Sequence, residues 1–280
     1  MKTIFEQFDT MDAFKRALDR PINEAFKLAE LHSQMTKESR VEWFGTKSYE
    51  EAINLYTNGW TEKADEIRRE FVKFERVSQR TVSYEKTRPT TSVVGFAPHV
   101  PNAILGLPNS MIHTERQPMK AKVVRIIYNM TQNAGTKADT ILQAGLTVLK
   151  IAYSMERQGY RVRLDLVPKC SEWGKERCCL MVSVKDWRQP IDIKKVAFPI
   201  ASPSMFRRLA FHWLETTPDC TSSGWTGGYG RSLEDAEKEK KMLAELGVLG
   251  DNDYYINVGI AKGYHFDPEK VAKAIGIKNY

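Results

Sequence analysis

The strongest candidate binding region in the sequence is a group of polar residues at the end of an apolar segment. Residues 123–130 (VVRIIYNM) have the composition of a buried parallel strand, and Asn129, Thr131, Gln132 and Asn133 lie at or just after its end. In an open α/β sheet, ligands bind outside the carboxyl ends of the strands, near helix N-termini that can receive an anion. A purely structural role as turn and helix-cap residues stays open.

Two histidines could supply acid–base chemistry to such a sheet edge. His99 and His113 lie in residues 87–119, a segment rich in Pro, Gly and apolar side chains. Prolines exclude a long helix there, and the apolar content is too high for a solvated linker. We expect an ordered loop laid across the α/β body, because ordered loops of this length are usually functional or strongly packed. No complete catalytic motif accompanies these histidines, so no catalytic residue is assigned.

The basic residues outnumber the acidic ones, 42 to 35, which gives a formal net charge of +7. A nucleic-acid site is typically a basic stripe with interleaved aromatic residues. Here most positive charges lie beside negative ones, so net charge is a minor clue. The small basic groups that remain as nucleic-acid candidates are Lys120, Lys122 and Arg125, then Arg161 and Arg163, then Arg207 and Arg208.

Metal and cofactor motifs are missing from the sequence. The four cysteines, Cys170, Cys178, Cys179 and Cys220, have no C-x-x-C spacing and no neighbouring histidine, whereas a structural zinc site needs four ligands. Phosphate-binding and dinucleotide-binding glycine patterns are also missing after the 123–130 strand. The Gly-rich segment 224–230 follows a polar turn and is predicted to be a loop. We expect no metal and no cofactor.

The composition excludes several classes of protein. With 280 residues, 42% of them hydrophobic, the chain can bury a large core, and collagen, coiled coils, transmembrane bundles and disulfide miniproteins are excluded. The charged N-terminus lacks the apolar core of a signal peptide. No apolar run approaches the ~18 residues of a membrane span. We therefore expect a cytoplasmic protein with reduced thiols and no membrane partner.

The elements that must position these residues divide the chain in two. Residues 1–86 are predicted to form an N-terminal helical region, in which Ser48 caps a helix that ends at Gly59. Residues 87–280, including the 87–119 loop, alternate strands and helices, which predicts an α/β fold with an open, doubly wound sheet. Its predicted elements are a strand at 123–130, a helix at 136–158, an edge hairpin from strands near 160–167 and 178–187, helices at 192–197, 204–214 and 233–246, a strand at 254–260, and a helix that starts at Pro268.

Three stretches resemble an uncharacterised family of proteins encoded by tailed bacteriophages and prophages. They are residues 43–60, 95–111 and 203–215. The resemblance implies a viral protein that acts in the cytoplasm of a bacterial host. The matching residues are Phe44, Thr46, Ser48, Glu51, Ala52, Gly59 and Trp60, then Pro98, Val100, Pro101, Gly106, Pro108, Ser110 and Met111.

The C-terminal part is also similar to a von Willebrand factor A-like domain, in its order of central strand, long helix, edge hairpin and further helices. That family binds a divalent cation through a D-x-S-x-S loop. The corresponding positions here are Asn129, Thr131 and Asn133. Because Asn129 replaces the anchoring aspartate and brings no negative charge, the resemblance implies a degenerate cation site.

Three functional hypotheses follow. The leading one is a non-enzymatic protein–protein interaction module with a degenerate cation loop. The first alternative is a nucleic-acid-binding protein of phage DNA metabolism. The second is an enzyme directed at a nucleotide or phosphoester, with the rim at residues 129–133 as its site and His99 or His113 supplied by the covering loop. The partner and the oligomeric state cannot be read from the sequence.

Overall fold

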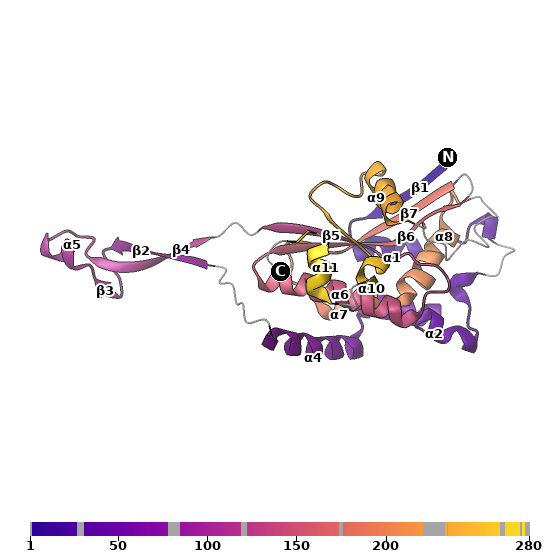
Figure 1. Cartoon of the computed structure of the whole chain (residues 1–280), viewed down its shortest axis with the longest axis horizontal. Coiled ribbons are helices and arrows are strands. Elements are labelled where there is room, and N and C mark those ends of the chain that lie inside the picture. Colours follow the sequence, from indigo (N-terminus) through magenta and orange to yellow (C-terminus); the bar gives the residue numbers. More distant parts are fainter. Residues whose placement is uncertain are drawn as a thin grey trace.

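The computed structural model describes residues 2–26, 31–77, 85–118, 122–173, 176–220, 233, 235–263, 267–274 and 276–277. These residues form an α/β body and a separate β-arm that extends from it (Figure 1). The body holds a five-stranded sheet, and the arm holds a three-stranded one. The α/β class predicted from the sequence is therefore confirmed.

The sheet of the body is mixed, with the strand order β1-β7-β6-β5-β8. β5 lies between β6 and β8 and is parallel to both, β7 is antiparallel to β6, and β1 is parallel to β7. The predicted central strand and hairpin are present. The strand predicted at 254–260 is shorter, because it ends at Asn257 and the helix α10 (Val258–Gly263) follows at once. The strand bounds are β1 (Lys2–Phe8), β5 (Val123–Asn129), β6 (Arg161–Trp173), β7 (Glu176–Lys185) and β8 (Tyr254–Asn257).

The first strand corrects two expectations. The prediction of a helical N-terminal region is wrong for residues 2–8, which form β1 at the edge of the sheet. A seven-residue segment that mixes charged and apolar side chains has too little periodicity to separate an edge strand from a helix. Because β1 pairs with β7, the β6–β7 hairpin is not the sheet edge, and β7 is buried from Cys178 to Lys185 rather than half exposed.

The other described elements up to Val77 are helices, as predicted, and Glu85 and Lys86 at the end of the region belong to a strand of the arm. Ser48 Oγ accepts a hydrogen bond from the N–H of Glu51 at 3.1 Å and caps α3. Gly59 ends that helix at φ 84°, where a Cβ atom would lie 2.7 Å from the carbonyl oxygen of Lys194. The helices are α1 (Met11–Leu18), η1 (Glu24–Phe26), η2 (His32–Gln34), η3 (Glu38–Arg40), α2 (Val41–Phe44), α3 (Tyr49–Asn58) and α4 (Thr61–Val77).

Helices cover the two faces of the sheet unequally. One face packs against α6, α7, α8 and the N-terminal helices around side chains such as Ile126 and Tyr128. The other face packs around Ile127 against α9. The bounds are α6 (Ala138–Arg157), α7 (Ile193–Ala201), the π-helix η4 (Met205–Ala210), α8 (Phe211–Thr216), α9 (Ala236–Glu245), α10 (Val258–Gly263) and α11 (Pro268–Ala274).

The arm replaces the predicted loop at 87–119. β2 (Glu85–Ser92) and β4 (Met111–Pro118) form an antiparallel ladder, and β3 (Ala97–Pro98) adds to β4. α5 (Val100–Ile104) lies at its far end (Figure 1). The segment does not cross the body, because its backbone groups pair within the arm itself. Pro89 fits this arrangement, since it lies on the edge strand β2, and edge strands are where sheets accommodate proline.

Candidate interaction site

The polar residues predicted as a binding rim do lie at the expected edge of the sheet. β5 and β8 end side by side, with Asn129 opposite Asn257. The chain leaves β5 toward β6 on one side and later returns to its other side as β8. This is a topological switch point, the place where open α/β sheets bind ligands.

Two of the rim side chains, however, are buried and form hydrogen bonds within the protein. Asn129 and Thr131 are fully buried. Asn129 donates from Nδ2 to the Tyr255 hydroxyl at 3.3 Å and accepts at Oδ1 from the N–H of Thr131 at 2.9 Å. Thr131 Oγ1 accepts from the N–H of Cys170 at 2.8 Å. These contacts give both residues the structural role that the sequence left open.

The loop after the rim is fixed by the N-terminal region. Gln132 donates to the carbonyl of Thr131 at 2.7 Å, and Asn133 is exposed. Trp43 donates from its indole N–H to the carbonyl of Ala134 at 2.7 Å, and Arg207 donates to the carbonyl of Thr136. Residues 43–60 and 203–215 also contact each other, since the hydroxyls of Thr46 and Ser204 are 2.9 Å apart.

A buried carboxylate that the sequence analysis missed completes the rim. Glu239 of α9 is 3% exposed and accepts hydrogen bonds from the Tyr255 hydroxyl at 2.5 Å and from Asn257 Nδ2 at 3.2 Å. Burial raises the pKa of Glu239, and burial together with Glu239 raises that of Tyr255. The signal in the sequence was the spacing of Glu239 with Met242 and Leu243, which places it on the apolar face of α9.

Lys169 of β6 is a second buried charged residue that the sequence analysis missed. Its side chain is fully buried, and burial lowers its pKa to about 8. All four cysteines are buried and free. Within the described ranges, no group of three or more His, Cys, Asp or Glu side chains could hold a metal ion.

Arg207 and Arg208 are not available to nucleic acid, contrary to the prediction. Both are fully buried on η4, over the rings of Trp43 and Phe44 at 4.1 and 4.2 Å from the ring centroids. Arg208 donates to three backbone carbonyls, those of Ser33, Met35 and Thr46. Burial lowers the pKa of Arg207 to about 10. The two guanidinium groups hold the N-terminal region on the body.

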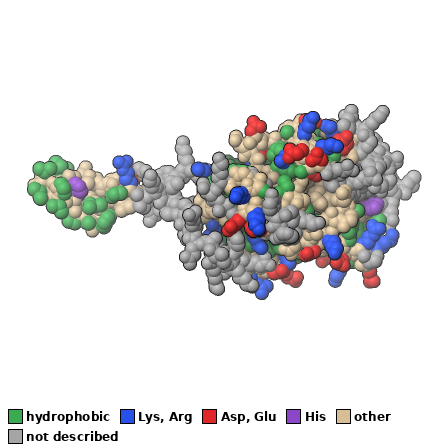
Figure 2. All heavy atoms as spheres, viewed as in Figure 1, with side chains coloured by type: hydrophobic (Ala, Val, Ile, Leu, Met, Phe, Trp, Pro, Cys, Tyr) green, Lys and Arg blue, Asp and Glu red, His purple; other side chains and the backbone are tan. Residues whose placement is uncertain are grey.

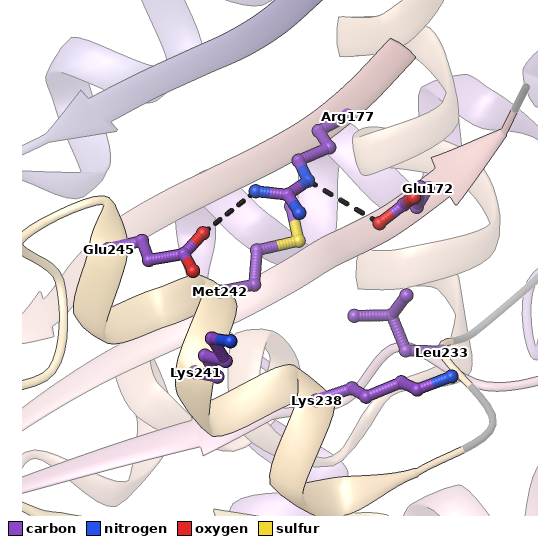
Figure 3. A pocket seen from close by; sticks show the side chains of 7 residues that line it. All are labelled: Glu172, Arg177, Leu233, Lys238, Lys241, Met242 and Glu245. Atoms are coloured by element: carbon purple, nitrogen blue, oxygen red, sulfur yellow. Dashed lines mark hydrogen bonds and ion pairs between the residues drawn. The ribbon is translucent and has the colours of Figure 1, made fainter. Parts of the chain in front are cut away.

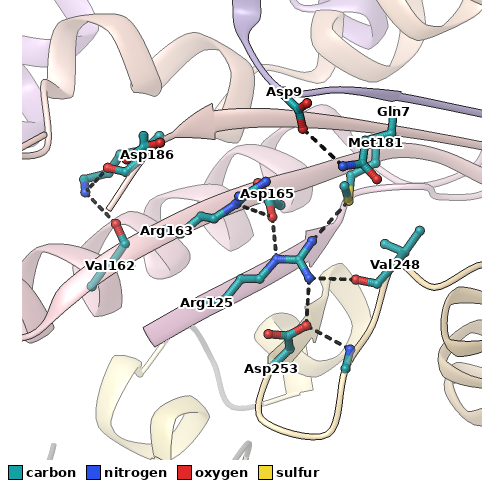
Figure 4. A network of polar contacts seen from close by, with 12 residues as sticks. Gln7, Asp9, Arg125, Val162, Arg163, Asp165, Met181, Asp186, Val248 and Asp253 are labelled. Atoms are coloured by element: carbon teal, nitrogen blue, oxygen red, sulfur yellow. Dashed lines mark hydrogen bonds and ion pairs between the residues drawn. The ribbon is translucent and has the colours of Figure 1, made fainter. Parts of the chain in front are cut away.

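Two further nucleic-acid candidates are engaged in ion pairs (Figure 4). Asp165, fully buried on β6, accepts from Arg125 at 2.5 Å and from Arg163 at 2.9 Å. Arg125 also binds Asp253 at 2.8 Å. Arg161 and Lys122 are exposed, and Lys120 lies outside the described residues, as does the Gly-rich segment 224–230. The described basic candidates therefore do not gather into one stripe.

A buried Ser–His–Glu group deserves comparison with a catalytic triad. Ser33 Oγ bonds to Glu215 and lies 3.3 Å from His212 Nδ1. In a triad, the acid and the nucleophile bind opposite nitrogens of the imidazole. Here both face Nδ1, and His212 Nε2 faces the carbonyl oxygen of Leu18. Since Ser33 is also fully buried, the group is structural.

A small pocket of about 260 Å³ lies between the β6–β7 hairpin and α9 (Figure 3). Arg177 crosses it and pairs with Glu172 at 3.4 Å and with Glu245 at 2.8 Å. Lys238 and Lys241 line the pocket on α9. Three basic side chains thus face two carboxylates, both of them paired with Arg177, and the lining carries a small excess of positive charge.

The most unusual surface of the molecule is the end of the arm, residues 93–112, which we call the arm tip. Hydrophobic side chains gather over it in Figure 2. Of the nine large hydrophobic residues that are exposed in the described part of the chain, seven lie on the arm tip, and the other two are Val123 and Trp187. The seven, which are 46–80% exposed, are Val93, Val94, Phe96, Val100, Ile104, Leu105 and Leu107.

Both candidate histidines are in the arm. His99 precedes α5, and His113 lies on β4 opposite Thr90. The arm extends away from the body, so the structure does not bring these histidines to the rim at residues 129–133 (Figure 1). The predicted convergence of loop and rim is wrong, because the β2–β4 ladder directs the segment outward.

Comparison with known families gives one match. A family model described as a domain of unknown function, DUF7192, matches residues 2–277. The chain belongs to the DUF7192 family. No curated protein and no solved structure matches it. The match includes both the body and the arm, so the arm is part of the DUF7192 domain.

Among the described helices, none is long and apolar enough to cross a membrane.

Proposed function

We propose that this DUF7192 protein is a non-enzymatic recognition module that engages its partner through the arm tip. The observation that carries the proposal is the exposure of seven large apolar side chains on one projecting element. Apolar patches larger than a few hundred Å² are rare on monomeric soluble proteins and usually mark an interaction site. The arm tip is therefore the element of the molecule best suited to binding.

The state of the sheet rim supports a role that is not enzymatic. The rim is the usual ligand site of this architecture, but Asn129, Thr131 and Glu239 are buried, and their hydrogen bonds go to Tyr255, Asn257 and backbone N–H groups inside the protein. A catalytic site needs groups that can reach a substrate. The described rim offers mainly Asn133 to solvent.

The body is the scaffold in this proposal. Its order of β5, α6, the β6–β7 hairpin and helices α7 and α8 is the order on which the resemblance to a von Willebrand A-like domain rests. The internal bonds of Asn129 and Thr131 support a degenerate cation loop. The phage origin and the cytoplasmic location stay predictions from the sequence.

Site-specific photo-crosslinking tests the proposal. A benzophenone amino acid replaces Phe96 on the arm tip or, as the control, Arg188 on the body, whose side chain is 72% exposed. After irradiation of cells that produce the full chain, we expect adducts at position 96 and not at position 188. The adducts should disappear when Ile104→Asp and Leu105→Asp are added. Equal adducts at both positions, or none at position 96, would contradict the proposal.

A further inference from the structure

We infer that the arm tip inserts into the interface of an anionic phospholipid bilayer. This inference rests on the proposed function and names the partner of the same surface. It concerns attachment to a membrane surface, whereas the length of apolar runs in the sequence excludes only a membrane-spanning helix.

The first argument is the polarity profile along the arm. Residues 89–114 contain no Lys, Arg, Asp or Glu. Within that range, the strand ends nearest the body carry mainly hydroxyl side chains (Thr90, Thr91, Ser92 and Thr114), and the arm tip is mainly apolar. Charged residues begin with Arg88 and Glu115, which face each other across the ladder. The order of apolar, polar and charged zones matches the order of acyl chains, interface and headgroups in a bilayer.

The dimensions agree with this profile. A strand rises about 3.3 Å per residue, so Arg88 lies roughly 17 Å along the strand from Val93 at the start of the arm tip. Interfacial elements bury their apolar face by about 5–10 Å at the boundary between headgroups and acyl chains. Charges at the base of the arm would then lie at the level of the headgroups.

The charge at the base favours anionic lipids. Residues 85–88 and 115–122, which flank the uncharged run, contain five basic residues and two acidic ones. The excess is three positive charges. Basic residues close to an anionic leaflet are attracted to it and strengthen binding. These residues are Lys86, Arg88, Arg116, Lys120 and Lys122, against Glu85 and Glu115.

The kinds of apolar side chain distinguish a lipid from a protein partner. The exposed residues of the arm tip are valine, leucine and isoleucine with a single phenylalanine, Phe96. Binding hot spots of protein interfaces are enriched in Trp, Tyr and Arg, and Leu and Val are under-represented there. The arm tip contains no Trp, Tyr or Arg. Its composition resembles a lipid-facing surface more closely than a protein hot spot.

Unpaired backbone N–H groups are costly in a medium of low polarity. In the arm tip, several N–H groups are hydrogen-bonded within the arm, and prolines remove others. The N–H of Phe96 bonds to the carbonyl of Ile112 at 2.9 Å, and that of His99 to Ser110 at 2.7 Å. Asn102 Nδ2 donates to the carbonyl of Asn109 at 2.8 Å. Three prolines carry no N–H at all, and they are Pro98, Pro101 and Pro108.

The body of a second copy offers little for the arm tip to bind. Over the described residues of the body, only Val123 and Trp187 are large, hydrophobic and exposed. A contact between two arm tips and a pocket of another protein are the alternatives, and the experiment below separates them.

Vesicle flotation tests the inference with the full-length chain. Vesicles of phosphatidylcholine with phosphatidylglycerol are compared with vesicles of phosphatidylcholine alone. We expect the chain to float with the anionic vesicles and to bind them less as salt increases. The double variant Ile104→Asp/Leu105→Asp should bind at least about tenfold more weakly, since each of the two substitutions removes a large apolar side chain that binding would bury. The matched control Trp187→Asp, which also introduces a charge at an exposed apolar position, should bind like the unchanged chain.

A fluorescent probe on Leu105→Cys checks that the arm tip itself enters the bilayer. A nitrobenzoxadiazole label there should shift to the blue and brighten with anionic vesicles, and the same label on Arg188→Cys should not change. The native cysteines are buried and do not compete for the label.

Four outcomes would overturn the inference. Flotation that Ile104→Asp/Leu105→Asp does not reduce would place the lipid contact elsewhere. Failure to float, with protein adducts at position 96 in the photo-crosslinking experiment, would leave the proposed function standing and identify a protein partner instead. Failure to float, with concentration-dependent dimers that the double variant abolishes, would identify contact between two arm tips. If neither lipid, protein nor self-contact occurs at position 96, the proposed function fails as well.

Discussion

The sheet rim buries polar side chains, whereas the arm tip exposes apolar ones. At the rim, Asn129, Thr131 and Glu239 are buried and hydrogen-bonded. At the arm tip, Ile104 and Leu105 are 80% and 72% exposed. Most proteins bury large apolar side chains and leave charged ones in water, so both regions are exceptions that need a physical reason.

The reasons differ. A buried, satisfied polar network specifies one arrangement of the chain and is costly to break. An exposed apolar surface contributes little to folding, and its burial remains available to drive association. Substitutions in the body should therefore change stability, and substitutions at the arm tip should change binding alone. The four predictions below test this division, from the largest expected effect to the smallest.

Arg208→Ala should destabilise the body most. The guanidinium donates to three carbonyls from the N-terminal region, which would lose their partner while buried. We expect the free energy of unfolding to fall by about 4 kcal/mol, measured by chemical denaturation. Arg188→Ala, at an exposed arginine, is the control and should change it by less than about 0.5 kcal/mol. Equal effects would show that η4 does not hold the N-terminal region in place.

Asp165→Asn should have the next largest effect. The buried carboxylate pairs with Arg125 and Arg163, and its loss leaves the partly buried Arg163 without this carboxylate and Arg125 with Asp253 alone. The expected loss is about 2–3 kcal/mol, smaller than for a fully buried pair because both arginines are partly exposed. Asp186→Asn, which removes an exposed pair with Arg188, should cost less than about 1 kcal/mol. A loss below that of the control would exclude the network as a source of stability.

Glu239→Gln should change how stability depends on pH. Burial raises the pKa of Glu239 in the folded state, so the folded chain binds its proton more tightly than the unfolded chain. Stability from this residue is present below the ordinary value of 4.5 and is lost as the pH rises toward the raised value. Relative to the unchanged chain, the variant should therefore become more stable in chemical denaturation as the pH rises from acidic to neutral. A constant difference at all pH values would contradict this.

Ile104→Asp should leave the stability of the body almost unchanged. Its side chain is 80% exposed, so we expect a change below about 0.5 kcal/mol in the free energy of unfolding. Phe14→Asp, which places a charge in the buried core, is the contrasting variant and should prevent or strongly weaken folding. A large loss for Ile104→Asp would show that the arm tip packs on the body, and the division between the two regions would fail.

Much of the local structure could be predicted from the residues of each segment. The β-branched run of β5, the Ser48 cap of α3 and Pro268 at the start of α11 were all assigned correctly. β1 was missed, since its only support is pairing with β7, which lies far along the chain. Periodicity and capping depend on neighbours in sequence, whereas an edge strand depends on its partner.

The candidate site shows the same division. The sequence located the rim, because the end of a buried parallel strand is recognisable from composition. It could not show that Asn129 faces Tyr255, or that Arg207 and Arg208 are buried under the N-terminal region. Adjacent arginines are usually a surface feature, and only contacts with distant segments make them internal.

The sequence by itself determined the α/β class, most helices of the body, the strands β5 to β8, and the uncharged run at residues 89–114. These features depend on residue type and on short-range order along the chain. Only the tertiary structure decided that the rim side chains turn inward and that the apolar run forms a projecting arm tip. Burial depends on which distant segments cover a residue: Glu239 is covered by β8, while no described part of the body covers Ile104.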